Sequence, residues 1–139
     1  MRCLVTGGCG FIGSALVRRL VAAQQQVTVV DDLSRGMTES LGPNAAEVTL
    51  VHRDVTTSLA AVVASARPHV IFHLAAVHYI PDCEADPARC LRVNVDGTRA
   101  VLEAAAAPDP PVPVVFASSA AVYAPGQRTA PGGRPPGTG

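Results

Sequence analysis

The chain has 139 residues, and its 11 arginines balance 11 acidic residues, so the formal net charge is 0. A hydrophobic share of 48% excludes an intrinsically disordered polymer, and the neutral balance argues against a nucleic-acid-binding surface, which needs clustered basic residues. No apolar run reaches the roughly 18 residues of a membrane span, and no signal peptide is recognisable at the N-terminus. We therefore expect one domain, or part of one, in the cytoplasm.

The cysteines indicate neither a metal site nor a disulfide framework. None of them forms a Cys-x-x-Cys pair, and no histidine stands at zinc-finger spacing. Small secreted domains that depend on disulfides are usually richer in cysteine. We therefore expect free, buried thiols in a reducing cytoplasm at Cys3, Cys9, Cys83 and Cys90.

Apolar strand-like runs alternate with helical segments along the chain. Residues 11–23 repeat apolar side chains every four positions, at Ile12, Leu16 and Leu20, which is typical of a helix packed on one side. Residues 27–30 are β-branched and indicate a strand. In chain order, the expected elements are a strand at 2–6, a helix at 11–23, strands at 27–30 and 48–51, a helix at 58–66, a strand at 69–74, a long helix at 87–106 and a strand at 112–117.

This alternation is the pattern of βαβ units, in which helices join successive parallel strands. Right-handed crossovers place helices on both faces of such a sheet. We therefore expect an α/β fold with a doubly wound parallel sheet of about five strands, within a domain at 1–123. Residues 124–139 are rich in proline and glycine and lack large apolar side chains, so we expect a disordered C-terminal tail there.

The strongest local motif follows the first strand and begins the first helix. Segment 6–13 reads Thr-Gly-Gly-Cys-Gly-Phe-Ile-Gly, in which Gly7, Gly10 and Gly13 give GxxGxxG. A tight strand-to-helix turn needs the positive φ that glycine adopts at little cost. A pyrophosphate can then approach the backbone N–H groups at the helix N-terminus. In this context the glycines predict dinucleotide binding rather than a plain turn.

Two acids, Asp31 and Asp32, end the second expected strand, 18 residues after Gly13. A carboxylate at that position can accept hydrogen bonds from both hydroxyls of an adenosine ribose, and it repels a 2′-phosphate. The acids therefore favour NAD over NADP. Arg35 instead favours NADP, because an arginine near the acid can accommodate that phosphate.

Further motifs follow in a characteristic order. They are Thr-Gly-Gly-Cys-Gly-Phe-Ile-Gly at 6–13, Asp-Asp-Leu-Ser-Arg-Gly at 31–36, Arg-Asp-Val at 53–55, His-Leu-Ala-Ala at 73–76, Asn-Val-Asp-Gly-Thr at 94–98 and Ser-Ser-Ala-Ala-Val-Tyr at 118–123. In this order and spacing they resemble the extended short-chain dehydrogenase/reductase family, and within it the NAD-dependent nucleotide-sugar epimerases and dehydratases. The resemblance implies a Rossmann-type fold, incomplete in this chain, with NAD as cofactor.

The resemblance also implies a role for each matching position. Residues 54–55 would flank the adenine, and 74–76 would form a floor beneath the pyrophosphate. Asn94 would brace the loop after the fourth strand, and His78 would lie near the nicotinamide ribose. Ser119 would be the catalytic hydroxyl that hydrogen-bonds the substrate oxygen being oxidised. The cofactor-binding residues implied are Gly7, Gly10, Phe11, Ile12, Gly13, Asp31, Asp32, Asp54, Val55, Leu74, Ala75, Ala76, His78 and Asn94.

Several of these residues have a structural alternative. Asp54 could instead stand at a helix N-terminus, and Ser118 and Ser119 could be small residues at a strand end. We interpret His73 as a core histidine with satisfied hydrogen bonds. In the family pattern Tyr123 is a structural tyrosine, and we assign it no chemistry.

The chain departs from the family pattern in the catalytic pair. The family chemistry uses a tyrosine as general base and a lysine four positions later on the same helix. This chain has no lysine, and Tyr79 and Tyr123 are followed four positions later by Cys83 and Gln127. We therefore expect the NAD-binding half of such an enzyme, which binds NAD at best weakly and is inactive alone.

Three functions remain open from the sequence. The first is the NAD-binding part of an enzyme that removes a hydride transiently from a carbon of a nucleotide sugar. The second is a non-catalytic dinucleotide-binding or regulatory module, which needs only the glycine loop and Asp31. The third is an NADP-dependent reductase of the same superfamily, against which Asp31 argues. An uncovered sheet edge would also favour a homodimer.

Overall fold

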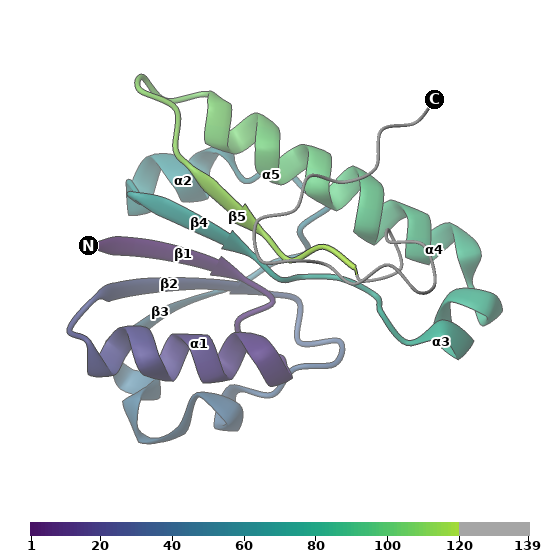
Figure 1. Cartoon of the computed structure of the whole chain (residues 1–139), viewed down its shortest axis with the longest axis horizontal. Coiled ribbons are helices and arrows are strands. Elements are labelled where there is room, and N and C mark those ends of the chain that lie inside the picture. The colour runs from purple at the N-terminus through teal and green to yellow at the C-terminus, as the bar shows by residue number, and fades with distance from the viewer. Residues whose placement is uncertain (120–139) are drawn as a thin grey trace, which may run out of the picture.

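Within residues 1–119, which the computed structural model describes, five parallel strands form one sheet. The strand order is β3-β2-β1-β4-β5, so the chain builds one side of the sheet from β1 and then returns to build the other (Figure 1). The strands are β1 (Arg2–Thr6), β2 (Gln26–Asp31), β3 (Val48–His52), β4 (Val70–His73) and β5 (Val114–Phe116). This arrangement confirms the expected Rossmann-type α/β fold.

Helical structure joins each strand to the next. The last three segments follow one another without a break and correspond to the expected long helix. The helical segments are α1 (Phe11–Ala22), the 3-10 segment η1 (Thr38–Glu47), α2 (Ala60–Ala66), α3 (Ile80–Ala85), α4 (Pro87–Leu91), the π-helical segment η2 (Arg92–Asp96) and α5 (Gly97–Ala106).

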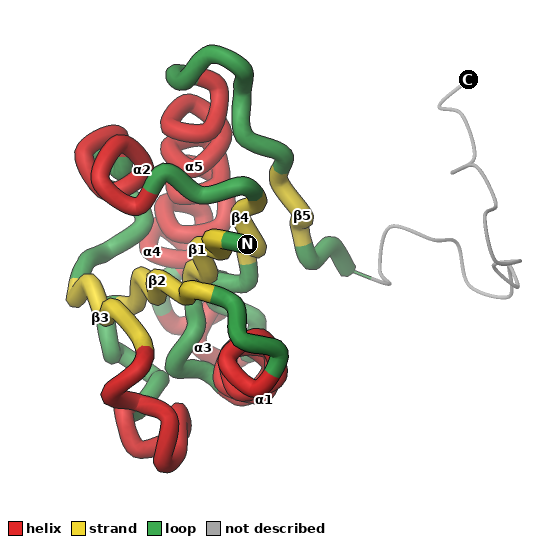
Figure 2. Tube along the Cα trace, turned by 90° about the vertical axis from the view of Figure 1, so that its left-hand side faces the viewer, coloured by secondary structure: helices red, strands yellow, loops and turns green. Residues whose placement is uncertain are grey.

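The helices cover both faces of the sheet, as the view along the strands in Figure 2 shows. One face packs against α1 and η1 through a cluster that includes Val5, Val17 and Val29. The other face packs against α2 and α5 through a cluster that includes Leu4 and Val101. Successive residues of a strand point to opposite faces of the sheet. Because helices cover both faces, neighbouring residues of β1 are both buried and both apolar.

The predicted elements agree with the structure except at their ends and in two segments. The second helix begins at Ala60 rather than at 58, and the last strand is shortened to 114–116. Segments η1 and α3 have no counterpart in the predictions. A turn at Gly42, whose φ is 69°, and the following Pro43 interrupt any helical periodicity in η1. The short helix α3 buries none of its residues, so it has no apolar face to recognise.

The prediction of free thiols is correct for Cys3 and Cys9, which are buried, and wrong for Cys83 and Cys90, which form a disulfide. Two residues seven positions apart on one straight helix would be separated by about 10 Å. Here α3 ends and α4 begins on either side of Asp86, which brings the two Cα atoms to 5.2 Å. That separation lies in the range that disulfides span. The pairing therefore depends on α3, the short helix that the sequence pattern does not predict.

Within the described part of the chain, no helix is both long enough and apolar enough to cross a membrane. Tyr123 and the tail expected at 124–139 lie outside the described residues.

Candidate functional site

The glycine segment forms a tight turn between β1 and α1. Gly7 has a φ of 70°, and a Cβ atom there would lie 2.7 Å from the backbone nitrogen of Ala75. A Cβ atom on Gly13 would lie only 2.0 Å from the carbonyl oxygen of Gly7. Both positions therefore require glycine, because the turn packs directly against the loop after β4 and against the first turn of α1.

The first turn of α1 presents backbone N–H groups that no acceptor within the helix can satisfy. Gly10 caps the helix without any side-chain hydrogen bond, and Ser14 is the residue whose N–H reaches back to the Gly10 carbonyl, at 2.9 Å. The N–H groups before it have no acceptor within the helix. The side chains of Phe11 and Ile12 are 96% and 68% exposed, and the first turn contains no acidic residue. This helix end therefore carries a partial positive charge that an anion can approach.

Asp31 is buried beside the glycine turn at the end of β2. One of its carboxylate oxygens accepts the Cys9 N–H at 2.9 Å, and the other accepts the Leu33 N–H at 2.8 Å. Each oxygen keeps a second acceptor position. Burial, followed by the charges of Asp31 and Glu39, raises the pKa of the Cys9 thiol to about 11. Cys9 is therefore a neutral packing residue, and its backbone fixes the orientation of the Asp31 carboxylate.

Asp32 is exposed and shapes the loop that follows β2. Its carboxylate accepts hydrogen bonds from the Ser34 N–H at 3.0 Å and from the Ser34 hydroxyl at 2.7 Å. Its carbonyl oxygen lies 3.0 Å from Nε2 of His52 on β3. The loop is thereby held at the same edge as the glycine turn.

Asp54 and Val55 lie in a turn after β3. The Asp54 carboxylate accepts the Thr56 N–H at 2.8 Å, and α2 begins only at Ala60, so Asp54 does not stand at the N-terminus of that helix. The Val55 side chain is buried in the core, where a Cβ on Gly97 would lie 2.7 Å from its Cγ2. The Val55 side chain therefore belongs to the core, and Gly97 is explained by close packing of the long helix against it.

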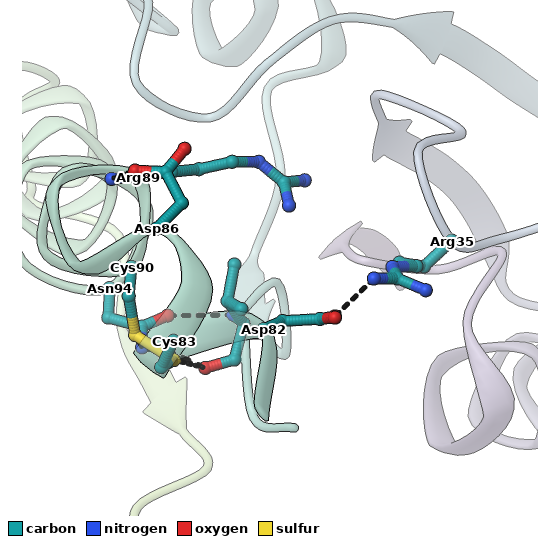
Figure 3. Close-up of a disulfide and its surroundings, with 8 residues drawn as sticks. Arg35, Asp82, Cys83, Asp86, Arg89, Cys90 and Asn94 are labelled. Atoms are coloured by element: carbon teal, nitrogen blue, oxygen red, sulfur yellow. Dashed lines mark hydrogen bonds and ion pairs between the residues drawn. A yellow bond between two sulfur atoms is a disulfide. The ribbon is translucent and has the colours of Figure 1, made fainter. Parts of the chain in front are cut away.

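The loop after β4 is tied both to β1 and to the long helix. The Leu74 N–H donates to the Thr6 carbonyl at 3.1 Å. Asn94 accepts the Val77 N–H at 2.8 Å and donates to the Val77 carbonyl at 2.9 Å (Figure 3). The Asn94 side-chain amide thus satisfies both backbone polar groups of Val77, as a neighbouring strand would. Of the other residues expected here, Ala75 is partly buried and Ala76 and His78 are exposed.

His73 is a core histidine, as expected. Its Nδ1 lies 2.7 Å from Oγ1 of Thr6, and its Nε2 lies 3.0 Å from Oγ1 of Thr98. The Thr98 hydroxyl donates to the Asn94 carbonyl at 2.7 Å, so the Nε2 proton of His73 points to Thr98. Burial lowers the pKa of His73. The imidazole is therefore held neutral, with a hydrogen bond at each nitrogen.

Most of the residues predicted for the site meet at the carboxyl edge of the sheet, on the loops after β1, β2 and β4. Ser119 is exposed and follows the end of β5 by three residues. Asp82 also faces this region, through its contact with Arg35 (Figure 3). Arg89 does so through its contact with Ser34. Both residues are far from the β2 loop in the sequence, so the sequence did not predict these contacts. Among the described residues, no group of three or more His, Cys, Asp or Glu side chains could hold a metal ion.

Comparison with known proteins agrees with this geometry. The model of the NAD dependent epimerase/dehydratase family matches residues 3–138, a match that extends beyond the last sequence motif at Tyr123. The UDP-glucose 4-epimerase of Mycolicibacterium smegmatis is 44% identical over 108 residues, which are 76% of this chain and 34% of that protein. The dTDP-glucose 4,6-dehydratase of the same organism is 39% identical over 107 residues, or 75% of this chain and 32% of that protein.

Among solved structures, the UDP-glucose 4-epimerase of Thermus thermophilus in complex with NAD superimposes with a TM-score of 0.69 at 34% identity. That match covers 75% of this chain and 33% of the other. The chain thus spans about a third of the length of the curated relatives it matches. The family is NAD-dependent, which confirms the expected cofactor. The family match and the identity to its members show that the chain belongs to the NAD-dependent epimerase/dehydratase family.

Proposed function

We propose that this chain is the NAD-binding part of an enzyme that epimerises or dehydrates a nucleotide sugar. The observation that carries the proposal is the buried carboxylate of Asp31, held beside the glycine turn by the Cys9 N–H at 2.9 Å. It sets an acceptor for ribose hydroxyls next to a helix end that attracts a pyrophosphate. The dehydratase and epimerase relatives support the substrate class.

The chemistry of the residues present fits a dinucleotide. The N–H groups of Phe11 and Ile12 would bind the pyrophosphate, because they have no acceptor within α1. Asp31 would bind the adenosine ribose through its remaining acceptor positions, with Asp32 beside it. When bound, NAD supplies a reversible acceptor for a hydride from a sugar carbon.

The other assigned residues surround the same edge. Asp54 and the backbone of Val55 would flank the adenine, and residues 74–76 would lie beneath the pyrophosphate. His78 would contact the nicotinamide ribose, and Asn94 would position the loop between them. Ser119 would hydrogen-bond the substrate oxygen, since it lies in the exposed segment after β5.

We further propose that the 139-residue chain binds NAD at best weakly and turns over no substrate. Tyr79 is 59% exposed at the start of α3, and four positions later stands Cys83, which is bonded to Cys90. The sequence contains no lysine that could lower the pKa of a tyrosine. General acid–base catalysis contributes about 10²–10⁴ in rate, so a chain without this pair loses at least that factor.

A non-catalytic dinucleotide-binding module is the second candidate, and the absence of lysine from the sequence favours it. An NADP-dependent reductase is disfavoured, because the carboxylate of Asp31 repels a 2′-phosphate. Leu91, Val95 and Leu102 of the long helix and Phe116 of the edge strand are exposed, which supports a homodimer.

The test is a calorimetric titration of NAD, and then of NADP, into the purified chain, followed by incubation with UDP-glucose and dTDP-glucose. We expect saturable NAD binding, weaker NADP binding and no conversion of either sugar. Absence of NAD binding by a chain with helical circular dichroism would overturn the proposal. Conversion of either sugar would overturn the claim of inactivity alone.

A further inference from the structure

Arg35 contacts a residue far away in the sequence. It lies in the loop after β2, and its guanidinium forms an ion pair with the carboxylate of Asp82 on α3 (Figure 3). The Asp82 side chain is 26% exposed, whereas that of Arg35 is 69% exposed. The pair therefore joins the loop after one strand to the helix after another, above the carboxyl edge of the sheet.

The backbone around Arg35 is fixed against the glycine turn. A Cβ atom on Gly36 would lie 2.8 Å from the backbone carbon of Cys9, and the Met37 N–H donates to the Cys9 carbonyl at 3.3 Å. Cys9 also donates its N–H to Asp31 at 2.9 Å. Arg35 is thus anchored next to the carboxylate that would hold the adenosine ribose. In dinucleotide-binding folds, an arginine near that acid is the group that accommodates a 2′-phosphate.

The second arginine at this edge is also engaged by the protein. The Arg89 guanidinium on α4 donates to the Ser34 hydroxyl at 3.3 Å, and that hydroxyl donates to the Asp32 carboxylate at 2.7 Å. Among the described residues, the guanidinium groups of Arg35 and Arg89 that reach the loop after β2 are therefore both in contact with protein acceptors. A 2′-phosphate would have to displace Asp82 from Arg35 and would meet its negative charge nearby.

The position of Asp82 is itself constrained. The next residue, Cys83, is bonded to Cys90, which joins α3 to α4. Asn94 holds the start of this segment through two hydrogen bonds to Val77. Asp82 is therefore presented to Arg35 by a cross-linked and braced pair of helices rather than by a free loop.

We propose that Asp82 is a specificity-determining residue, which keeps the site selective for NAD by occupying the guanidinium that a 2′-phosphate would need. This inference rests on the proposed NAD-binding function. The Asp31 carboxylate repels the phosphate directly, and Asp82 engages Arg35, a cation that could compensate for that repulsion. An ion pair this exposed adds little to folding stability, so its removal should change ligand preference while leaving the fold intact.

The experiment is a double-mutant cycle in the full chain, with Asp82→Asn, Arg35→Gln and both together, each titrated with NAD and with NADP. Asp82→Asn should strengthen NADP binding about tenfold, the gain of one charge-assisted hydrogen bond, and change NAD binding less than about twofold. Arg35→Gln should abolish that gain in the double variant and leave the NADP affinity of the wild-type background unchanged. Glu84→Gln removes the same charge from an exposed site on α3 and should change neither affinity.

Three results would overturn the inference. One is an Asp82→Asn chain with the wild-type ratio of NADP to NAD affinity, and another is a gain that survives Arg35→Gln. The third is a loss of NADP affinity in Arg35→Gln alone, which would show that Arg35 binds the 2′-phosphate in spite of its ion pair with Asp82. This result needs no Asp82 variant, so it tests the inference even if Asp82→Asn fails to fold. If the wild-type chain binds neither dinucleotide, the proposed function fails as well, whereas NAD binding with an unchanged ratio overturns only the role of Asp82.

Discussion

Replacement of Gly13 by alanine tests the glycine turn most sharply. The new Cβ atom would lie 2.0 Å from the Gly7 carbonyl oxygen, closer than any real contact of this kind. Relief requires a backbone movement of about 1 Å, which would weaken the 3.2 Å hydrogen bond from the Gly10 N–H to the same oxygen. Helix α1 therefore cannot keep its present distance from the turn.

The expected loss follows from opposing terms. Overpacking costs about 1–3 kcal/mol, and a weakened hydrogen bond adds about 1 kcal/mol. Alanine inside a helix is more favourable than glycine by about 1 kcal/mol, which offsets part of this loss. We therefore expect Gly13→Ala to lower the free energy of unfolding by about 2 kcal/mol and to displace the N–H groups that would bind a pyrophosphate.

Urea unfolding followed by circular dichroism measures the stability, and titration with NAD measures the site. Gly10→Ala is the matched control, because its Cβ would lie 3.3 Å from the same oxygen and its φ of −75° suits any residue. That variant should lose about 1 kcal/mol or less, the cost of alanine at an N-cap. A Gly13→Ala chain as stable as the wild type, with unchanged NAD affinity, would refute the close packing described for the turn.

Three further predictions concern the network behind the site. Because burial lowers the pKa of His73, the unfolded chain binds more protons than the folded chain below about pH 6.5, so the free energy of unfolding should decrease as the pH is lowered through that range, by up to about 1.4 kcal/mol per pH unit. Urea titrations across that range measure the slope, and His73→Gln should flatten it. Asn94→Ala removes both hydrogen bonds to Val77 and should cost about 1–3 kcal/mol, whereas the exposed Arg92→Ala should stay within about 0.5 kcal/mol. Reduction of the Cys83–Cys90 disulfide, with a sequence separation of 7, should lower the free energy of unfolding by about 2 kcal/mol, and a Cys83→Ser chain should not respond to the reductant.

The parallel sheet could be predicted because its signals are local. The short apolar strands, the spacing of Ile12, Leu16 and Leu20 and the glycines around Gly10 each depend on neighbouring residues. The same holds for Asp31, whose position at a strand end follows from the strand itself. The core role of His73 was also accessible, since a histidine within an apolar strand is usually a packing residue.

The contacts that the sequence did not predict depend on distant residues. Arg35 and Asp82 are 47 positions apart, so no local pattern joins them. The disulfide between Cys83 and Cys90 depends on α3, which buries none of its residues and so shows no apolar periodicity. Gly97 is needed because a Cβ atom there would lie 2.7 Å from Cγ2 of Val55, which is 42 positions away in the sequence. Such features follow from tertiary packing rather than from the local chain.

Dinucleotide binding at the glycine turn is tested most directly by a nuclear magnetic resonance titration of the isotope-labelled chain with NAD, in which each backbone amide reports separately. We expect the largest shifts on residues 10–13, 31–34 and 74–77, which surround the carboxyl edge. Residues 24–28, which line an open cavity at the opposite edge, should be unaffected. Shifts confined to that opposite edge, with unchanged amides at Phe11 and Ile12, would contradict a dinucleotide site built on the glycine turn and Asp31.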